Sequence, residues 1–236
     1  PTRELTTRLL LLAKTRAGYL RLCELLSSAY LRPRRHGRAE IARAAFAGDN
    51  SGLLALSGAH FGAVGQWLAA DKHDPAAAAA RDWATLFPGN FYLEIQRPDG
   101  TANHPAQERL IAATLRLAAE LDLPVVATHP VQFLDADDFR AHEARVCIAE
   151  GYVMGDKRRP QNFSAAQYFR TQDEMCALFA DLPEALANSV EIARRCNLSV
   201  ELGKSRLPEF PTPPGVSIED YLGQAARAGL AQRLAH

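Results

Sequence analysis

Leu123-Pro-Val-Val-Ala-Thr-His-Pro-Val-Gln-Phe133 is the stretch of sequence that decides the fold. It predicts a short buried strand, Val125–Thr128, which runs into a loop that opens with His129-Pro130. In α/β folds, the residues that carry function lie in loops beyond the carboxyl ends of the strands. His129 is therefore the first candidate for a functional side chain.

Three further strands are predicted upstream of this loop, over Leu5–Ala13, Gly52–Gly58 and Phe91–Gln96. Helical patterns separate the strands, and Pro105–Leu121 is the helix that leads into the opening strand. The order βαβααβαβ predicts parallel strands covered by helices, which is an α/β fold.

The first helix should follow Thr15, whose hydroxyl can cap it. Its apolar residues are expected on one side, with Arg21 and Glu24 facing outward. The residues expected on the apolar side are Leu20, Leu22, Leu25, Leu26 and Ala29.

Helices dominate the second half of the chain. One is predicted over Asp137–Glu150, the capping box Thr171-Gln-Asp-Glu174 starts another, and Pro183–Arg195 is a third. Leu198–Leu202 is predicted to be a final strand. The Pro-rich segment 208–215 predicts a stiff linker and a domain boundary before a last helix.

Composition excludes several classes of protein. The 236 residues have a formal net charge of zero, which argues against a dedicated nucleic-acid or membrane surface. No apolar run approaches the roughly 18 residues that span a bilayer. Pro1-Thr-Arg-Glu4 does not begin a signal peptide, so we expect a cytoplasmic protein with no membrane partner. The basic segment 32–38 is interpreted as a solvated loop, with phosphate contact as the alternative.

The four cysteines are scattered, and none belongs to a CxxC pair. Each lies in a helical pattern beside apolar residues, which predicts small buried side chains in a reducing compartment. They are Cys23, Cys147, Cys176 and Cys196.

The sequence contains no Walker loop, GxGxxG, GxSxG or HExxH motif. The candidate metal ligands at strand ends are Glu94, His129 and His60, fewer than a hydrolytic metal site normally requires. For Glu94, an exposed or salt-bridged strand position is the alternative. His142 is interpreted as a hydrogen-bonded structural residue.

Four runs of sequence carry a resemblance to a known family. They are Asp138-Phe-Arg-Ala-His-Glu-Ala-Arg-Val-Cys-Ile-Ala-Glu-Gly151, Tyr168-Phe-Arg170, Leu178-Phe-Ala-Asp-Leu-Pro-Glu-Ala-Leu-Ala-Asn-Ser-Val-Glu-Ile-Ala-Arg-Arg-Cys-Asn197 and Leu207-Pro-Glu-Phe-Pro211. They resemble the bacterial DNA polymerase III alpha subunits, the replicative C-family polymerases. The resemblance extends through essentially the whole chain and is most specific from about Gly89 onward.

This resemblance implies a polymerase-and-histidinol-phosphatase (PHP) domain, which is a distorted (β/α) barrel. Residues 1–150 would form an incomplete PHP barrel that lacks its first strands, and 151–207 its helical continuation. Residues 208–236 would form the Pro-rich linker and a helix leading to the palm. The absence of an initiator Met and the end inside a helical run indicate a fragment, with the palm and its Mg²⁺ outside it.

The resemblance also implies that the PHP metal site is degenerate. Glu94 falls on the strand Glu of the family, and Ala59 on the Cys of its metal-binding members. The family pattern Thr-Asn-Asp-x-His is replaced by Thr128-His-Pro-Val-Gln132, so that His129 occupies the Asn position, Pro130 the ligand Asp and Gln132 the ligand His. Proline offers no donor atom and glutamine is a poor transition-metal ligand, so this region is expected to bind no cofactor.

The implied function is that of a structural scaffold in a polymerase that extends DNA by nucleotidyl transfer. A separate proofreading exonuclease subunit would dock on it, beside other holoenzyme subunits, while DNA and dNTP would bind mainly elsewhere. A metal-dependent PHP phosphoesterase or 3′–5′ exonuclease is one alternative. An error-prone alpha paralogue is the other.

Overall fold

The computed structural model describes residues 6–31, 39–101, 104–205, 208 and 210–235. Leu5 and the basic segment 32–38 lie outside the described residues. The chain divides into two compact units, Pro1–Ser199 and Val200–His236.

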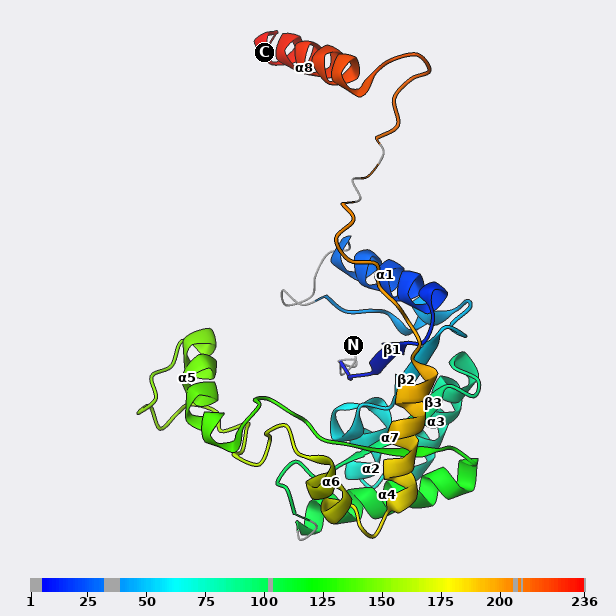
Figure 1. The fold of residues 1–236 in the computed structure, drawn as a ribbon, viewed down its shortest axis with the longest axis vertical. Coiled ribbons are helices and arrows are strands. Elements are labelled where there is room, and N and C mark those ends of the chain that lie inside the picture. Colours follow the sequence, from blue (N-terminus) through cyan, green and yellow to red (C-terminus); the bar gives the residue numbers. More distant parts are fainter. Residues whose placement is uncertain (1–5, 32–38, 102–103, 206–207, 209, 236) are drawn as a thin grey trace. The chain divides into compact units, whose positions relative to one another are not determined.

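The first unit contains a four-stranded sheet in the order β1-β2-β3-β4 (Figure 1). The strands are β1 (Leu10–Ala13), β2 (Leu53–Leu56), β3 (Phe91–Gln96) and β4 (Val125–Thr128). β2, β3 and β4 are parallel, as predicted. The α/β class is confirmed.

β1 runs antiparallel to β2, so the prediction that all the strands are parallel is wrong. The reason is a close approach between two glycines. A Cβ atom added to Gly18 would lie 1.8 Å from the carbonyl oxygen of Gly52, and Lys14 N donates to the same oxygen at 2.8 Å. The start of the first helix is therefore fixed beside the start of β2, and the end of β1 must lie there too.

Helices make up most of the remaining structure. The α-helices are α1 (Arg16–Leu31), α2 (Ala63–Ala69), α3 (His73–Leu86), α4 (Pro105–Leu121), α5 (Phe139–Glu150), α6 (Gln172–Leu178), α7 (Pro183–Arg195) and α8 (Ile218–Leu234). The short 3₁₀ helices are η1 (Arg43–Phe46), η2 (Ala59–Phe61) and η3 (Ala136–Asp138). The predicted bounds of α4 and α7 are confirmed, as is the capping box at Thr171.

Two predictions about packing are wrong. Leu20 and Leu26 of α1 are about half exposed, because the buried stripe follows Gly18, Leu25 and Ala29. Arg21, expected to face outward, turns inward and donates to Ala45 O at 2.6 Å.

Leu198–Leu202 forms no strand. Val200 and Leu202 are exposed, so they lack the buried face that stabilises a strand. The outer edge of β4 is also occupied, since Asn188 Nδ2 in α7 donates to Val125 O at 2.8 Å.

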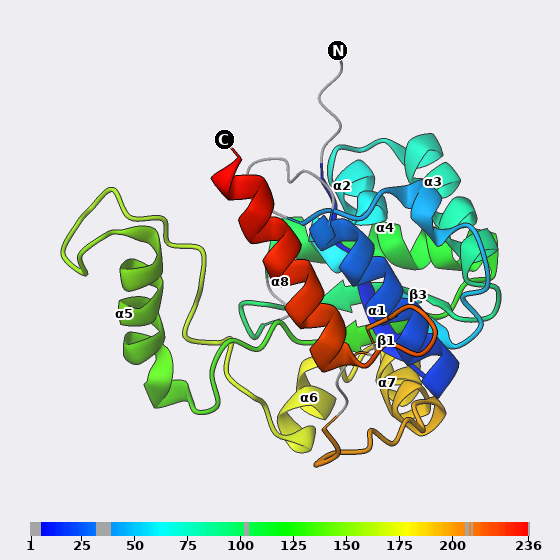
Figure 2. The ribbon, with the colours of Figure 1, turned by 90° about the horizontal axis from the view of Figure 1, so that it is seen from above.

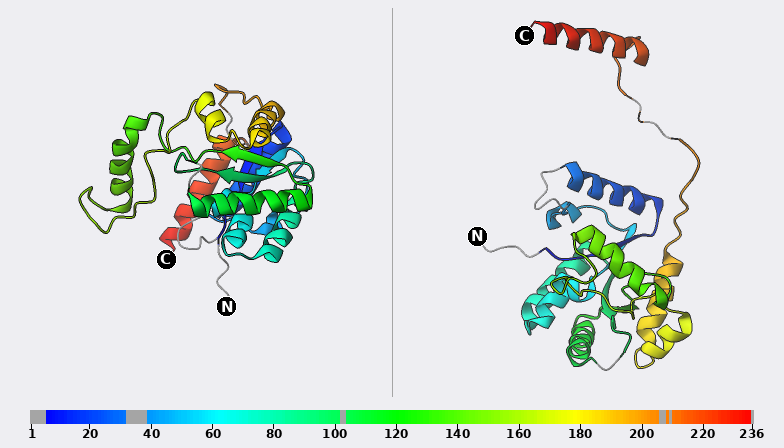
Figure 3. Two further views of the ribbon diagram at one scale, coloured as in Figure 1. Left: turned by 90° about the horizontal axis from the view of Figure 1, so that it is seen from below. Right: turned by 90° about the vertical axis from the view of Figure 1, so that its left-hand side faces the viewer.

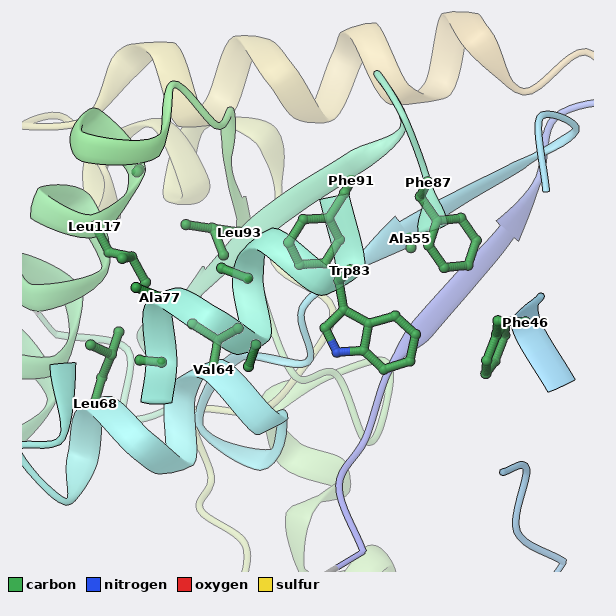
Figure 4. Close-up of a cluster of buried hydrophobic side chains, with 14 of the residues drawn as sticks. Phe46, Ala55, Val64, Leu68, Ala77, Trp83, Phe87, Phe91, Leu93 and Leu117 are labelled. Atoms are coloured by element: carbon green, nitrogen blue, oxygen red, sulfur yellow. The ribbon is translucent and has the colours of Figure 1, made fainter. Parts of the chain in front are cut away.

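One face of the sheet packs against α2, α3 and α4 (Figure 3). Its core includes the ring cluster of Phe46, Trp83 and Phe87, in which Phe46 and Trp83 meet edge to face at 5.5 Å (Figure 4). Alanines of α3 are fully buried beside these rings, which lets the helix lie close to the sheet. Burial of these apolar side chains is the main stabilising term for the unit.

The opposite face packs against α7. Ile192 of α7 joins Leu54, Leu56, Tyr92 and Val126 in a separate buried cluster. The sheet is therefore covered on both faces, as a parallel sheet requires.

Residues 131–170 leave the sheet and carry α5, which stands apart from the strands (Figure 2). This segment has its own small core of aromatic rings, in which His142 packs against Phe133 and Phe163. Arg145 Nη2 lies 3.1 Å from His142 Nδ1, which confirms the interpretation of His142 as a hydrogen-bonded structural residue.

The cysteines are free thiols with different environments. Cys147 is buried beside Met154, as predicted, whereas Cys176 is exposed on α6. The prediction is wrong for Cys176, because the buried cluster under this short helix is filled by Met175 and Leu178.

The predicted last helix is α8 of the second unit, and Ser217 caps it by accepting from Asp220 N at 3.1 Å. Phe210 packs on Tyr221 with ring centroids 5.5 Å apart. Within the described residues, no helix combines the length and the apolar character needed to cross a membrane.

Replacing Leu93 with Ala tests the core. Leu93 is fully buried in the centre of β3, so the free energy of unfolding should fall by about 2–5 kcal/mol. Leu134→Ala removes an exposed side chain and should change it by less than about 0.5 kcal/mol. Urea denaturation of both variants measures the difference, and equal losses would contradict the assigned core.

Candidate site at the carboxyl edge of the sheet

The carboxyl ends of β2, β3 and β4 meet at one edge of the sheet. Glu94 pairs with Val126, and Gln96 pairs with Thr128, across the parallel ladder between β3 and β4. On the other side, Ser57 Oγ accepts from Glu94 N at 2.9 Å. The sequence-predicted strand ends therefore lie together.

Glu94 is buried, with 6% of its surface exposed. Its carboxylate accepts hydrogen bonds from Gly58 N at 3.1 Å, Gln96 Nε2 at 3.0 Å and Thr128 Oγ1 at 2.5 Å. The alternative that Glu94 is an exposed or salt-bridged position is therefore wrong. Three neutral donors stabilise the buried charge instead of a cation.

The turn after β2 brings its backbone under Glu94. Gly58 has φ +82°, and a Cβ atom at that position would lie 2.3 Å from Arg8 O, so only glycine fits. Ala59, which follows, is buried with φ +45° and carries no side-chain donor atom. Because its side chain is a methyl group, Ala59 cannot bind a metal ion together with Glu94.

His129 stabilises the loop after β4 through a hydrogen bond. Its Nε2 lies 2.8 Å from Ala166 O, and because a carbonyl can only accept, Nε2 carries the proton. Nδ1 is then a buried lone pair with no partner among the described residues. Burial lowers the pKa of His129, the hydrogen bond to Ala166 acts in the opposite direction, and the imidazole is neutral at pH 7.

The two neighbouring positions are also tied to the segment around Gln167. Pro130 O accepts from Gln167 Nε2 at 3.2 Å, and Gln132 N donates to Gln167 O at 2.8 Å. The Gln132 side chain is exposed. The loop is thus held by its backbone and by one histidine.

His60 lies in η2, close to the carboxyl ends of the strands. It and Glu94 both line a cavity of about 630 Å³ between α2 and α4. His60 stacks on Phe61, and Arg8 lies over the same ring at 4.3 Å. Burial, and then Arg8, lower the pKa of His60, so this side chain is also neutral at pH 7.

The donor set at this edge does not fit a metal pair. Glu94 is the carboxylate, Ala59 and Pro130 have no donor atom, and Gln132 offers only an amide. Across the part of the chain that the structure describes, no three His, Cys, Asp or Glu side chains gather in a way that could hold a metal ion. A hydrolytic site needs three or more ligands for each ion.

The sequence of this chain is similar to those of known proteins. Residues 2–98 match the PHP domain family. Over 229 residues, 96% of the chain, the sequence is 51% identical to DNA polymerase III subunit alpha of Neisseria meningitidis serogroup A, covering 20% of that protein. The chain is homologous to the PHP region of DNA polymerase III subunit alpha.

The corresponding subunits of Pseudomonas aeruginosa and Escherichia coli K12 are 46% and 43% identical over 97% of the chain. The chain spans about a fifth of the length of each of these relatives. The similarity therefore includes the helices after the PHP match, among them α5, α6 and α7.

Arg97, which sequence reasoning missed, joins the end of the PHP match to those helices. Its guanidinium is almost fully buried, with 1% of the side chain exposed. It forms paired hydrogen bonds to Glu108 of α4, at 2.9 and 2.7 Å, and to Asp181, at 2.7 and 2.9 Å. A further bond of 2.6 Å reaches Leu178 O, so all five N–H donors are used.

Electrostatics agree with this geometry. The two carboxylates raise the pKa of Arg97, and the Arg97 guanidinium lowers the pKa of Asp181. The guanidinium also lies over the ring of Phe179, 4.9 Å from its centroid. An arginine just after a strand gives little signal in the sequence, because its two partners lie 11 and 84 residues away.

Replacing Arg97 with Met should lower the free energy of unfolding by about 3 kcal/mol, the lower end for a broken buried pair. The loss is limited because Glu108 and Asp181 are partly exposed and can be hydrated. Asp181→Asn leaves Arg97 paired with Glu108 and should cost only about 1 kcal/mol. Chemical denaturation measures the free energy of unfolding of both variants. The control is Arg158→Met, which removes the exposed partner of the Asp156 ion pair. Equal losses of unfolding free energy in all three variants would show that the buried hydrogen bonds of Arg97 do not stabilise the fold.

The pH dependence of His129 provides a separate test. A histidine whose folded pKa is lowered contributes stability that is complete above its unfolded pKa of about 6.5 and is lost as pH falls toward the folded value. The Cε1–H resonance of His129, assigned by its loss in His129→Gln, should titrate with a midpoint below 6.5. A midpoint above 6.5 would contradict the buried neutral form.

Proposed function

We propose that the chain serves as the PHP region of a bacterial replicative DNA polymerase III alpha subunit. The whole polymerase would extend DNA by nucleotidyl transfer, with Mg²⁺ held in its palm. This region would act as a structural scaffold and a docking site for the proofreading exonuclease subunit, within the holoenzyme. Homology to the alpha subunit across 96% of the chain supports the assignment.

The hydrogen bonding of Glu94 is the observation that carries the structural role. Its two carboxylate oxygens are occupied by donors from β3, β4 and the turn after β2. Three of the roughly four lone pairs of this carboxylate therefore hold the strand ends together, which leaves a single one, on Oε2, for an ion. Pro130 and Gln132 support the same interpretation, since neither replaces the ligand that the family pattern has there.

The sheet would then belong to an incomplete PHP barrel over residues 1–150. Residues 151–207 would be its helical continuation, and 208–236 the linker and helix toward the palm. Arg97 supports a scaffold role, because it binds the barrel edge to the helices that follow it.

A metal-dependent PHP phosphoesterase or exonuclease is the competing function. Glu94, His129 and His60 at strand ends favour it, and so does the buried Nδ1 lone pair of His129, which has no partner among the described residues. Against it, no three His, Cys, Asp or Glu side chains of the described residues gather in a way that could hold a metal ion. An error-prone alpha paralogue is a further alternative, which would share the scaffold role.

Metal analysis tests the proposal. The full chain, dialysed against Zn²⁺ or Mn²⁺, should retain less than one ion per molecule and should not hydrolyse p-nitrophenyl phosphate or a 3′-labelled oligonucleotide. Glu94→Gln should have the same activity as the unaltered chain. Two bound ions with hydrolysis that depends on Glu94 would overturn the scaffold proposal in favour of the phosphoesterase.

A binding experiment tests the docking role. The full chain and the proofreading exonuclease subunit from the same organism should form a 1:1 complex in analytical ultracentrifugation. The complex should persist in a metal chelator, because no ion is needed at the sheet edge. Two species that sediment independently would count against docking while leaving the homology intact.

A further inference from the structure

Two cationic side chains lie close together at the amino end of β3, whereas Glu94 lies near its carboxyl end. Lys14 follows β1, and Arg195 is the last residue of α7. Lys14 Nζ donates to Asn90 Oδ1 at 2.7 Å, and Arg195 Nη2 donates to the same oxygen at 2.5 Å. Two positive charges thus share one neutral acceptor.

No carboxylate in the described part of the chain forms an ion pair with either side chain. Arg97 shows the contrast, because there the fold supplies two carboxylates to one buried cation. The end of α7 and Gly89 O, 3.0 Å from Arg195 Nη2, provide only partial negative charge. Burial and then Arg195 lower the pKa of Lys14, as expected for a cation held beside another, while the nearby Cys196 thiol acts in the opposite direction.

Lys14 and Tyr92 have hydrogen-bond donors that are not used within the described residues. An ammonium group has three N–H donors, and Lys14 uses one of them on Asn90. Tyr92 is buried, with 5% of its surface exposed; its Oη accepts from Arg195 Nη1 at 2.7 Å, so the hydroxyl hydrogen is the one donor that Tyr92 could offer to an anion held by Arg195. Lys14 and Arg195 are half-buried, so solvent and small solutes can reach them.

Two charges and several donors around one point suit a tetrahedral oxyanion, which accepts several charge-assisted hydrogen bonds. We propose that Lys14, Arg195 and Tyr92 form a binding site for a phosphate group, supplied by free phosphate or pyrophosphate or by the backbone of a DNA strand. The bound anion would neutralise the cation pair and would link the β1–α1 junction to the end of α7. The DNA source rests on the proposed polymerase function, but the free anions do not.

Thermal unfolding of the full chain tests the site. Phosphate should raise the Tm of the unaltered chain more than chloride does at equal ionic strength. Phosphate also stabilises proteins generally, because it is excluded from their surface. Specific binding is therefore measured by comparing the Tm gain between variants. Lys14→Met and Arg195→Gln should lose the specific part of the gain, whereas Lys157→Met, which removes an exposed lysine from the 131–170 segment, should keep it.

Phosphorus NMR titration measures the affinity directly. Each of the two site variants should weaken binding of inorganic phosphate by about tenfold or more, as expected for loss of a charge-assisted hydrogen bond. Tyr92→Phe should weaken it less, and Lys14→Arg should retain it. If Lys14→Met does not fold, as judged by circular dichroism, the comparison of Tyr92→Phe and Lys14→Arg still decides. Equal affinity in all folded variants would overturn the proposal.

Competition separates the sources. Displacement of phosphate by pyrophosphate, but not by a short single-stranded oligonucleotide, would assign the site to free anions. Displacement by the oligonucleotide, with loss of that effect in Arg195→Gln, would assign it to DNA. Failure of the oligonucleotide arm alone would exclude DNA as the source of the phosphate group and would leave both the phosphate site and the proposed scaffold role standing.

Discussion

The buried guanidinium of Arg97 is the interaction on which the arrangement of this chain depends. A charge with 1% of its side chain exposed is tolerated only when each of its donors finds an acceptor. Those acceptors come from α4, from the end of α6 and from the turn before α7. The position of the helices that follow the sheet is therefore set by the need to satisfy one side chain at the end of β3.

The carboxyl edge of the sheet follows the same rule with a charge of opposite sign. Glu94 is buried without a cation, and neutral donors from three neighbouring segments replace one. Both charges are thus used to join strands and helices, and at Arg97 all five donors are used. A guanidinium whose donors are all used inside the protein is well suited to structure and poorly suited to binding a ligand.

Much of the fold could be predicted from the sequence because local signals were strong. β3, β4, α4 and α7 have their predicted bounds, since apolar runs, an N-terminal proline and turn residues all agree there. The direction of β1 could not be predicted, because it depends on contact between Gly18 and Gly52, which are remote in sequence. For the candidate site, the sequence predicted that Glu94 and His129 lie at strand ends, and the structure has them there. The sequence could not identify their partners, because Thr128, Ala166 and Gln167 are brought to them only by the sheet and the returning loop.

The contact between Asn188 and Val125 has a consequence for how the sheet can grow. An amide side chain from α7 occupies one main-chain acceptor on the outer edge of β4, so a further strand at that edge would have to displace it. At the other edge, β1 has no second strand beside it among the described residues. A strand added to this sheet, from the same polypeptide or another one, would therefore have to replace a side-chain hydrogen bond at β4 but no strand at β1.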